Sequence, residues 1–322
     1  MKRIAVVEGD GIGQEVVPIA REVVEAFLPD ADFFEIKVGF EKWETDGTAC
    51  GEEEIRQLKS SDAILFGAVT TPPDPDYKSV MIQIRKTLDL YGNIRPVRSN
   101  NTDIIIVREN TEGMYSGIEW EEDDRACTLR IITRKGSTRI ARMACELVGG
   151  RKHLTVGHKA NVLRSDTLFR ECCLNEANKA GIIFNEEYID SLCYNVLMHP
   201  ERYDVIVTTN IFGDILSDAA AYLAGGLGML PSANIGDVNA LFEPVHGSAP
   251  DIAGKGIANP VAAIRSAGML LDYLGLTCAP AMIEGAISHA ISEGVTTPDL
   301  GGKYGTKAFG DAILGNIKNN LN

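Results

Sequence analysis

The sequence predicts an α/β protein built around a largely parallel sheet and divided into about two domains. Short apolar runs typical of strands alternate along the chain with segments whose apolar residues recur at helical spacing. The length of 322 residues exceeds the roughly 150 residues of a typical domain, and a hydrophobic content of 45% is enough to bury a core.

The alternation starts at the N-terminus, with a strand over 4–8, a glycine-rich turn over 9–13 and a helix over 14–28. Further strands are expected at 33–38, 63–66, 103–107, 154–157 and 204–208, and further helices at 52–58 and 79–90. Because ligands of such sheets bind at the carboxyl ends of the strands, functional residues are sought there.

One segment breaks this alternation. Residues 117–120, an acidic turn over 121–125 and the alternating polarity of 126–133 predict a β-hairpin in mid-chain. An isolated hairpin is only marginally stable until it packs on something. The hairpin is therefore either a surface feature or a clasp that packs on a second subunit.

The turn over 9–13 has glycines at the wrong spacing for a Rossmann fold. The dinucleotide-binding fingerprint is G-x-G-x-x-G, whereas the glycines here stand at 9, 11 and 13 and position 14 is Gln. We therefore do not predict a Rossmann fold, and interpret the segment as a structural turn whose backbone contacts a ligand locally.

Charge and composition exclude several classes of function. A net charge of −14 argues against a general nucleic-acid binder, which needs a basic surface. The N-terminal apolar run is too short for a signal peptide, and no apolar stretch approaches the roughly 20 residues of a membrane helix. The seven cysteines contain no Cys-x-x-Cys pair. We expect a reduced, cytoplasmic protein without nucleic-acid or membrane partners.

Asp214 and Asp218 form the main candidate metal site. They follow the strand over 204–208 and stand four residues apart, which places both carboxylates on one helix face. Two like charges at that distance need compensation, and Mg²⁺ or Mn²⁺ prefers such oxygen ligands. Asp190 is a third possible ligand. The alternative is a solvated acidic helix face.

Arg85, Arg95 and Arg108 stand near the ends of predicted elements. Each alone is typical of a surface ion pair, but arginines in a cleft bind carboxylates through two parallel hydrogen bonds. Together with an acidic metal site they indicate a di- or tricarboxylate substrate. Lys159 is a candidate base and Tyr115 a candidate acid, although chemistry alone identifies neither.

Four segments together resemble a known family. They are EGDGIG at 8–13, VRENTEGMY at 107–115, NIFGDILSD at 210–218, and HGSAPDIAG at 246–254 continuing to Asn259-Pro260. The chain is thereby similar, nearly from end to end, to the β-decarboxylating dehydrogenases of metal-dependent 2-hydroxy acids. This family comprises the 3-isopropylmalate, homoisocitrate and isocitrate dehydrogenases.

The resemblance implies a two-domain α/β/α fold distinct from the Rossmann fold. Residues 1–98 and 226–322 would form a discontinuous cofactor-binding domain, and residues 99–225 a substrate and dimerisation domain. The hairpin near 117–133 would interlock with a partner in an obligate homodimer. Lys159 and Asp190 would then reach the active site of the other subunit.

The resemblance also implies a mechanism in which NAD accepts a hydride and the β-carboxylate is then lost. Lys159 would assist removal of the hydroxyl proton, Tyr115 would protonate the enolate, and Asp190, Asp214 and Asp218 would hold Mg²⁺ or Mn²⁺. The implied substrate-binding residues are Arg85, Arg95, Arg108, Val80, Met81, Ile82, Asn161, Val162 and Asp190. The implied cofactor-binding residues are Ile12, Glu243, His246, Gly247, Ser248, Ala249, Asp251, Ile252 and Asn259.

Cofactor and substrate choice depend on few side chains. Asp251 favours NAD, because a carboxylate accepts hydrogen bonds from ribose hydroxyls and repels a 2′-phosphate. The apolar surface of residues 80–82 with Val162 favours 3-isopropylmalate, and thus a place in leucine biosynthesis, since an unpaired carboxylate there would be costly. Homoisocitrate and isocitrate are the alternatives, and Lys78 could reach the additional carboxylate of homoisocitrate.

A rival of a different class is a non-catalytic regulatory subunit on the same fold. Such a subunit would be expected to lack catalytic residues, whereas Tyr115, Lys159 and the three aspartates are all present. One departure from the family is the short connection between Arg95-Pro96 and Arg108. We expect it to change contacts at the edge of the cleft without removing an arginine.

Overall fold

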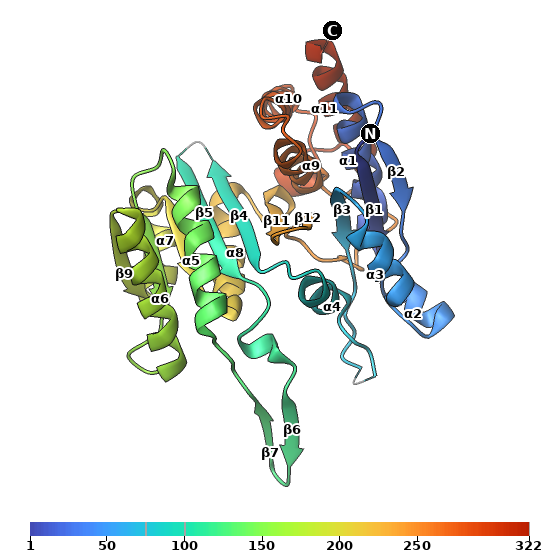
Figure 1. Ribbon diagram of the computed structural model, residues 1–322. Coiled ribbons are helices and arrows are strands. Elements are labelled where there is room, and N and C mark those ends of the chain that lie inside the picture. Colours follow the sequence, from blue (N-terminus) through green and yellow to red (C-terminus); the bar gives the residue numbers. More distant parts are fainter. Residues whose placement is uncertain (75, 100, 322) are drawn as a thin grey trace. The chain divides into compact units, whose positions relative to one another are not determined.

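The protein, described here by a computed structural model covering residues 1–74, 76–99 and 101–321, forms two compact units (Figure 1). The first comprises Met1–Leu88, Leu227–Ala233 and Asp237–Asn322, and the second comprises Asp89–Gly226 and Asn234–Gly236. Each unit consists of strands covered by helices. The α/β fold class that the sequence predicts is confirmed.

The first unit contains parallel strands, among which β1 carries the glycine-rich turn and β12 the cofactor segment on either side of β3. In order across its sheet the strands are β2 (Asp32–Glu35), β1 (Arg3–Gly9), β3 (Ala63–Ala68) and β12 (Ala240–Pro244). Its helices are α1 (Gly13–Phe27), α2 (Phe40–Asp46), α3 (Glu52–Lys59), α4 (Val80–Thr87), α9 (Val261–Tyr273), α10 (Ala279–Ser292) and α11 (Thr306–Leu321). Two 3₁₀ turns lie at Leu227–Met229 and Pro298–Leu300.

Helix α1 shows why this part of the chain is helical. Its apolar residues Val16, Ala20, Val23 and Val24 recur at helical spacing and are fully buried. They form the face that packs on β1, β3, α9 and α11. None of the helices in the described part of the chain is both long and apolar enough to cross a membrane.

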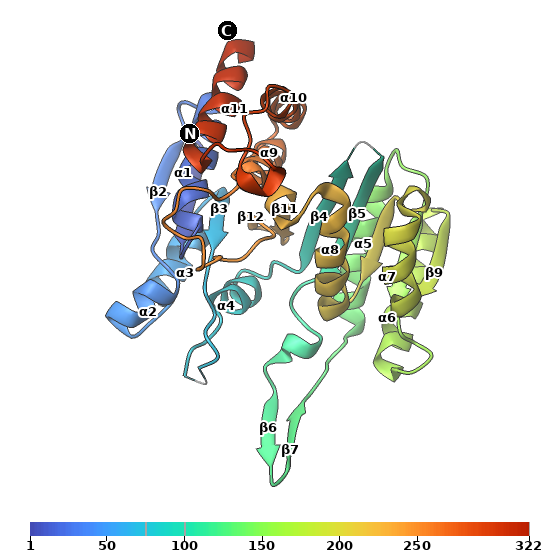
Figure 2. The same ribbon diagram turned by 180° about the vertical axis from the view of Figure 1, so that it is seen from behind.

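The second unit carries a five-stranded sheet with helices on both faces. In order its strands are β4 (Gly92–Ser99), β5 (Thr102–Glu109), β10 (Val205–Thr208), β8 (Leu154–His158) and β9 (Phe184–Tyr188), all parallel except β4. Helices α5 (Arg134–Val148) and α6 (Arg164–Ala180) cover one face, while α7 (Ile189–Met198) and α8 (Asn210–Ala224) cover the other (Figures 1 and 2). Two 3₁₀ turns lie at Met114–Ser116 and Pro200–Arg202.

The sequence analysis predicted no strand at the position of β4. Its Gly92, Asn93 and Pro96 are unfavourable in strands, which explains the omission. The pairing with β5 runs as far as Ser99 opposite Thr102. The connection that looked short therefore consists largely of strand, since residues 97–99 belong to β4 and residues 102 and 103 to β5.

The boundary predicted at residue 98 is also displaced. Because β4 pairs with β5, the second unit already begins at Asp89. It also includes Asn234–Gly236, which are the last two residues of β11 (Pro231–Ile235) and the residue after it. The helix expected over 79–90 is shorter, at Val80–Thr87, and the strand expected over 33–38 lies at Asp32–Glu35.

The mid-chain hairpin consists of β6 (Glu119–Glu122) and β7 (Arg125–Thr128), which pair antiparallel. It extends away from the sheet of its unit (Figure 1). Trp120 remains 49% exposed there, and Ile118 and Leu129 at its base are similarly exposed. The described residues of its own chain thus leave these apolar side chains of the hairpin about half exposed.

Candidate active site

Two arginines of the second unit extend from neighbouring strands toward α8. In the β4–β5 pairing Asn93 lies opposite Arg108 and Arg95 opposite Ile106, which places both arginine side chains on one face of the sheet. Helix α8 covers that face, and Gly213 permits its close approach. A Cβ atom at Gly213 would lie 2.7 Å from Cβ of Arg108.

The guanidinium groups of these arginines meet the two carboxylates predicted to bind metal. Arg95 lies 3.2 Å from an oxygen of Asp214 and 3.2 Å from an oxygen of Asp218. Arg108 contacts the same oxygen of Asp214. The arginine side chains are buried, whereas those of Asp214 and Asp218 are 32% and 53% exposed. The carboxylates thus present oxygens to solvent above a buried positive layer.

Burial raises the pKa of Asp218. The guanidinium of Arg95 lowers this pKa, and the negative charge of Asp214 raises it, so that the pKa remains above its ordinary value. Two carboxylates one helical turn apart repel each other. A divalent cation would relieve that repulsion, so the donor set fits a hard metal ion.

Tyr115 joins the same cluster from the 3₁₀ turn that follows β5. Its hydroxyl lies 3.4 Å from the second oxygen of Asp214, and its ring lies 6.0 Å from Cζ of Arg108. The structure therefore brings together Arg95, Arg108, Tyr115, Asp214 and Asp218, all of which the sequence analysis singled out.

Lys159 and Asp190 form a separate pair at the carboxyl ends of β8 and β9. Lys159 Nζ lies 2.5 Å from Asp190 Oδ1, and this ion pair lowers the pKa of Asp190. The residues that the structure describes contain no group of three potential ligands close enough to hold a metal ion. Within one chain, Asp190 therefore does not complete a triad with Asp214 and Asp218.

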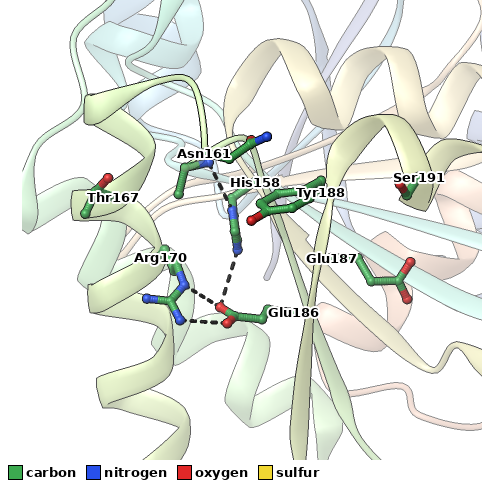
Figure 3. Close-up of a pocket in the computed structure, with 9 residues that line it drawn as sticks. His158, Asn161, Thr167, Arg170, Glu186, Glu187, Tyr188 and Ser191 are labelled. Atoms are coloured by element: carbon green, nitrogen blue, oxygen red, sulfur yellow. Dashed lines mark hydrogen bonds and ion pairs between the residues drawn. The ribbon is translucent and has the colours of Figure 1, made fainter.

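A cavity of about 600 Å³ is lined by residues that flank Lys159 and Asp190 in the sequence, among them His158, Ala160 and Ser191. Figure 3 shows this cavity. Asn161, predicted to bind substrate, contributes to its lining, and Ser191 follows Asp190. Glu186 lies between Arg170 and His158, with which it makes an ion pair and a hydrogen bond (Figure 3). These contacts fix the polar wall of the cavity.

Arg85, predicted to bind substrate, is paired with Glu243, predicted to bind cofactor. Its Nη2 lies 2.9 Å from Glu243 Oε1, and both side chains are largely buried in the first unit. The Nε atom of Arg85 is buried without a hydrogen-bond partner in the described residues. One donor of the guanidinium group thus remains for a ligand.

Hydrogen bonds hold the predicted cofactor segment, residues 246–254, against the glycine-rich turn over 9–13. The N–H of Ile12 donates to the carbonyl of Ser248 over 2.9 Å, and a Cβ at Gly11 would lie only 2.1 Å from that oxygen. Further along, the N–H of Gly254 donates to Glu15 over 2.6 Å. The predicted cofactor residues 246–254 therefore form a loop held at both ends against the start of α1.

Within this loop His246 is buried and Asp251 is exposed. Nδ1 of His246 lies 2.9 Å from the Gly247 carbonyl and therefore carries the proton, which leaves Nε2 as an acceptor. That Nε2 atom has no partner in the described residues, and burial lowers the pKa of the ring. The neutral imidazole can thus accept a hydrogen bond from a ligand.

The predicted specificity residues differ in accessibility. Val80 is completely buried, whereas Met81 and Ile82 are half-buried and Val162 is 68% exposed. The side chain of Val80 therefore packs in the core and is not available to a substrate. Met81 and Ile82 are the accessible apolar side chains at the start of this helix. The remaining predicted cofactor residues are Gly247, exposed; Ala249 and Ile252, half-buried; and Asn259, buried.

The sequence analysis did not identify the residues that hold the arginines. Asn210 accepts from Nε and Nη2 of Arg108, and Ser217 and Asn93 accept from Arg95. Asn210 stands four residues before Asp214 on the same helix, so the helical spacing that singled out Asp214 could also have indicated Asn210.

The family model, two relatives and one solved structure that match this chain are all named as dehydrogenases of related hydroxy acids. The family model described as "Isocitrate/isopropylmalate dehydrogenase" matches residues 3–313. The homoisocitrate dehydrogenase of Methanocaldococcus jannaschii is 47% identical over 100% of this chain and 99% of its own. The 3-isopropylmalate dehydrogenase of Archaeoglobus fulgidus is 44% identical over 97% and 98%. A crystal structure of isocitrate dehydrogenase from Methylococcus capsulatus superimposes with a TM-score of 0.95 at 40% identity, covering 99% and 100%.

These matches extend over the whole chain and include the segments that carry the arginine, tyrosine and aspartate cluster. Members of the family are oxidoreductases that act on hydroxy carboxylates with NAD and a divalent metal ion. The chain therefore belongs to the isocitrate/isopropylmalate dehydrogenase family of enzymes.

Proposed function

We propose that the protein catalyses the NAD-dependent, divalent-metal-dependent oxidative decarboxylation of a 2-hydroxy acid with a malate core, with 3-isopropylmalate as its substrate and 2-oxoisocaproate as its product. The observation that carries this proposal is the cluster in the second unit. Two buried guanidinium groups, two half-exposed carboxylates and a tyrosine hydroxyl converge on one face of α8. Arginines bind the carboxylates of such a substrate, and the aspartates hold a metal ion.

Asp214 and Asp218 would hold Mg²⁺ or Mn²⁺ together with Asp190 of a second copy of the chain. When bound, the metal would supply Lewis-acid chemistry for the reaction. Arg95 and Arg108 orient the malate carboxylates. Because both are almost completely buried and hydrogen-bonded by Asn93, Ser217 and Asn210, their positions are fixed before substrate binds.

Two side chains move protons. Lys159 assists removal of the hydroxyl proton of the substrate, and its ion pair with Asp190 holds the amine in place. Tyr115 protonates the carbon that loses the β-carboxylate, and its hydroxyl is held toward the metal-binding face by Asp214. Removal of either group abolishes a different proton transfer.

The cofactor is NAD rather than NADP. Asp251 is exposed on the loop that follows His246, where its carboxylate accepts hydrogen bonds from the ribose and repels a 2′-phosphate. The free Nε2 of His246 offers an acceptor to a donor of the dinucleotide. Hydrogen bonds already hold both ends of the loop, so cofactor binding costs little conformational entropy there.

The substituent of the substrate contacts Met81 and Ile82 of α4. These half-buried apolar side chains suit an isopropyl group, since they offer no hydrogen bond to a carboxylate. Homoisocitrate is the second candidate. Relatives named for it share 47% identity with this chain, and the exposed Lys78 stands just before Ser79, the N-cap residue of α4.

The active form is a homodimer with shared active sites. Large apolar side chains remain exposed on α7, α8 and the hairpin, which indicates a surface that a second copy covers. They are Ile118, Trp120, Leu129, Tyr194, Leu197, Met198, Ile215 and Tyr222. Such a partner also supplies the Lys159 and Asp190 that stand apart from the cluster around Asp214.

A substrate panel tests this proposal. The pure protein is assayed with 3-isopropylmalate, homoisocitrate, isocitrate and malate, each with NAD or NADP and with Mg²⁺, Mn²⁺ or EDTA. We expect NADH formation that EDTA abolishes, with the highest kcat/KM for 3-isopropylmalate and NAD. A higher kcat/KM for homoisocitrate would show that homoisocitrate, and not 3-isopropylmalate, is the substrate. No turnover with any of the acids would refute the proposed reaction.

A further inference from the structure

Arg130 connects the three segments that carry the proposed functional residues of the second unit. It lies between the hairpin and α5, and its neighbours Leu129 and Ile131 are hydrogen-bonded to Ile118 and Gly113. The segment paired with them, 113–118, contains Tyr115. The backbone of Arg130 is thus fixed beside the tyrosine turn.

The guanidinium group of Arg130 reaches two helix N-termini. Nη2 lies 2.6 Å from Oδ1 of Asp166 in the first turn of α6, and Nη1 contacts the neighbouring Ser165 hydroxyl. Nη2 also lies 3.2 Å from the hydroxyl of Thr209, the residue that precedes α8. The Cζ atom lies 5.5 Å from the ring centre of Phe212 on α8.

Asp166 also binds the backbone of Lys159, in the loop that follows β8. Its side chain is completely buried, and its second oxygen accepts the backbone N–H of Lys159 over 2.7 Å. A buried carboxylate that loses its cationic partner becomes strongly unfavourable. The position of Lys159 therefore depends on the Arg130–Asp166 ion pair.

We propose that Arg130 is a positioning residue that holds the Lys159 loop, the start of α8 and the tyrosine turn in one fixed arrangement. This inference depends on the roles proposed above for Lys159, Tyr115 and Asp214. In a dimer with shared sites, Lys159 acts in the partner's site while Tyr115 and Asp214 act in their own. One buried ion pair in each subunit then sets the geometry of both active sites.

The first test is amide hydrogen exchange, which does not require activity. Arg130→Met is expected to accelerate exchange of the Lys159 N–H, bound to Asp166, and of the Gly213 N–H, bound to the Thr209 carbonyl, by at least about 10-fold. Arg142→Met is the matched control. Arg142 is 62% exposed and pairs with Glu176 of the same helix α6, a carboxylate that also pairs with Lys179. Unchanged exchange in Arg130→Met, or equal acceleration in Arg142→Met, would overturn the proposal.

The second test is kinetic. Arg130→Met is expected to lower kcat about 100-fold, because an error of about 1 Å in a reacting group costs that much, while KM for NAD changes less than about 2-fold. Arg130→Lys, which keeps the charge but not the planar fork, is expected to recover part of kcat. Thr209→Val removes only the hydrogen bond between Arg130 and the Thr209 hydroxyl, keeps the contact with Phe212, and is expected to lower kcat a few-fold.

The outcomes separate this inference from the proposed function. A wild-type protein without turnover refutes the proposed reaction, and the exchange test then still decides whether Arg130 holds the network. A folded Arg130→Met variant with wild-type kcat refutes the positioning role alone. Equal losses in kcat, NAD affinity and thermal stability would show general destabilisation and would likewise refute it.

Discussion

His246 links the stability of the first unit to pH at the scale of a single residue. Burial lowers its pKa below the ordinary value of 6.5, so the unfolded chain binds a proton more readily than the folded one. The stabilisation is present above pH 6.5 and is lost as pH falls through the lowered pKa of the folded state. His246→Gln is expected to flatten this part of the stability–pH curve and to raise KM for NAD.

The measurement is urea unfolding at pH values from about 7.5 down to 5. His289→Gln, which changes an exposed histidine of the same unit, is the matched control and should reproduce the wild-type curve. A His246→Gln curve with the wild-type slope would contradict the expected role of the buried ring.

The sequence indicated the chemistry of the site residues better than their partners. Each of Arg95, Arg108 and Asp214 alone also fits a surface ion pair or a solvated helix face, and it is their combination in the family motifs that predicts a site. That Arg85 pairs with Glu243 could not be predicted, since the two are far apart in sequence and meet only through the fold. Val80 was misjudged because periodicity does not say which side of a short helix faces the core.

At the scale of elements, the contact between α8 and β5 depends on Gly213. A Cβ atom there would lie 2.7 Å from Cβ and Cγ of Arg108, too close for any rotamer of a fully buried arginine to avoid. Gly213→Ala is therefore expected to displace α8, to lower the free energy of unfolding by about 1–3 kcal/mol and to weaken Mn²⁺ binding. Denaturant unfolding and metal titration check both effects.

Gly315→Ala is the control for this substitution. Gly315 lies in helix α11, where a Cβ atom would meet nothing within 4 Å. Its replacement should stabilise the protein by about 0.5–1 kcal/mol through the helix propensity of alanine and leave metal binding unchanged. Stabilisation by Gly213→Ala as well would refute the close-packing argument.

Elements with strong periodicity were predictable, and elements defined by their neighbours were not. Helix α1 and the strands β1, β5, β8 and β10 appear as apolar runs in the sequence itself. Strand β4 contains Gly92 and Pro96 and is a strand only because β5 pairs with it along eight residues. The hairpin was recognisable because its alternation is not interrupted by helix-type spacing.

At the scale of the whole molecule, the division of the chain followed from the family resemblance rather than from composition. No linker rich in glycine, proline or serine marks the change at Leu88, and the three glycines at 225, 226 and 228 beside Leu227 look like the other glycine turns of the chain. Strand β11 contributes residues to both units, which no local pattern can reveal. The exposed apolar side chains of α7, α8 and the hairpin appear only once the helices are folded.

Shared active sites give a prediction that only a dimer can satisfy. Lys159→Ala and Tyr115→Phe are each expected to abolish turnover in the homodimer. In a mixed dimer, however, the Tyr115 of the first variant meets the Lys159 of the second, and one of the two sites is intact. Since half of randomly formed dimers are mixed, unfolding and refolding an equal mixture should restore up to about one quarter of wild-type activity.

The control is the same mixture without refolding, in which subunits do not exchange and turnover should stay absent. Lys159→Ala mixed with Asp190→Ala is a second control. Both residues enter the same site from the same subunit, so the mixed dimer has Lys159 in one site and Asp190 in the other, and neither is complete. No recovery with Lys159→Ala and Tyr115→Phe would show that each subunit completes its own site. Recovery in the Lys159→Ala and Asp190→Ala control would show that these two residues enter one site from different subunits.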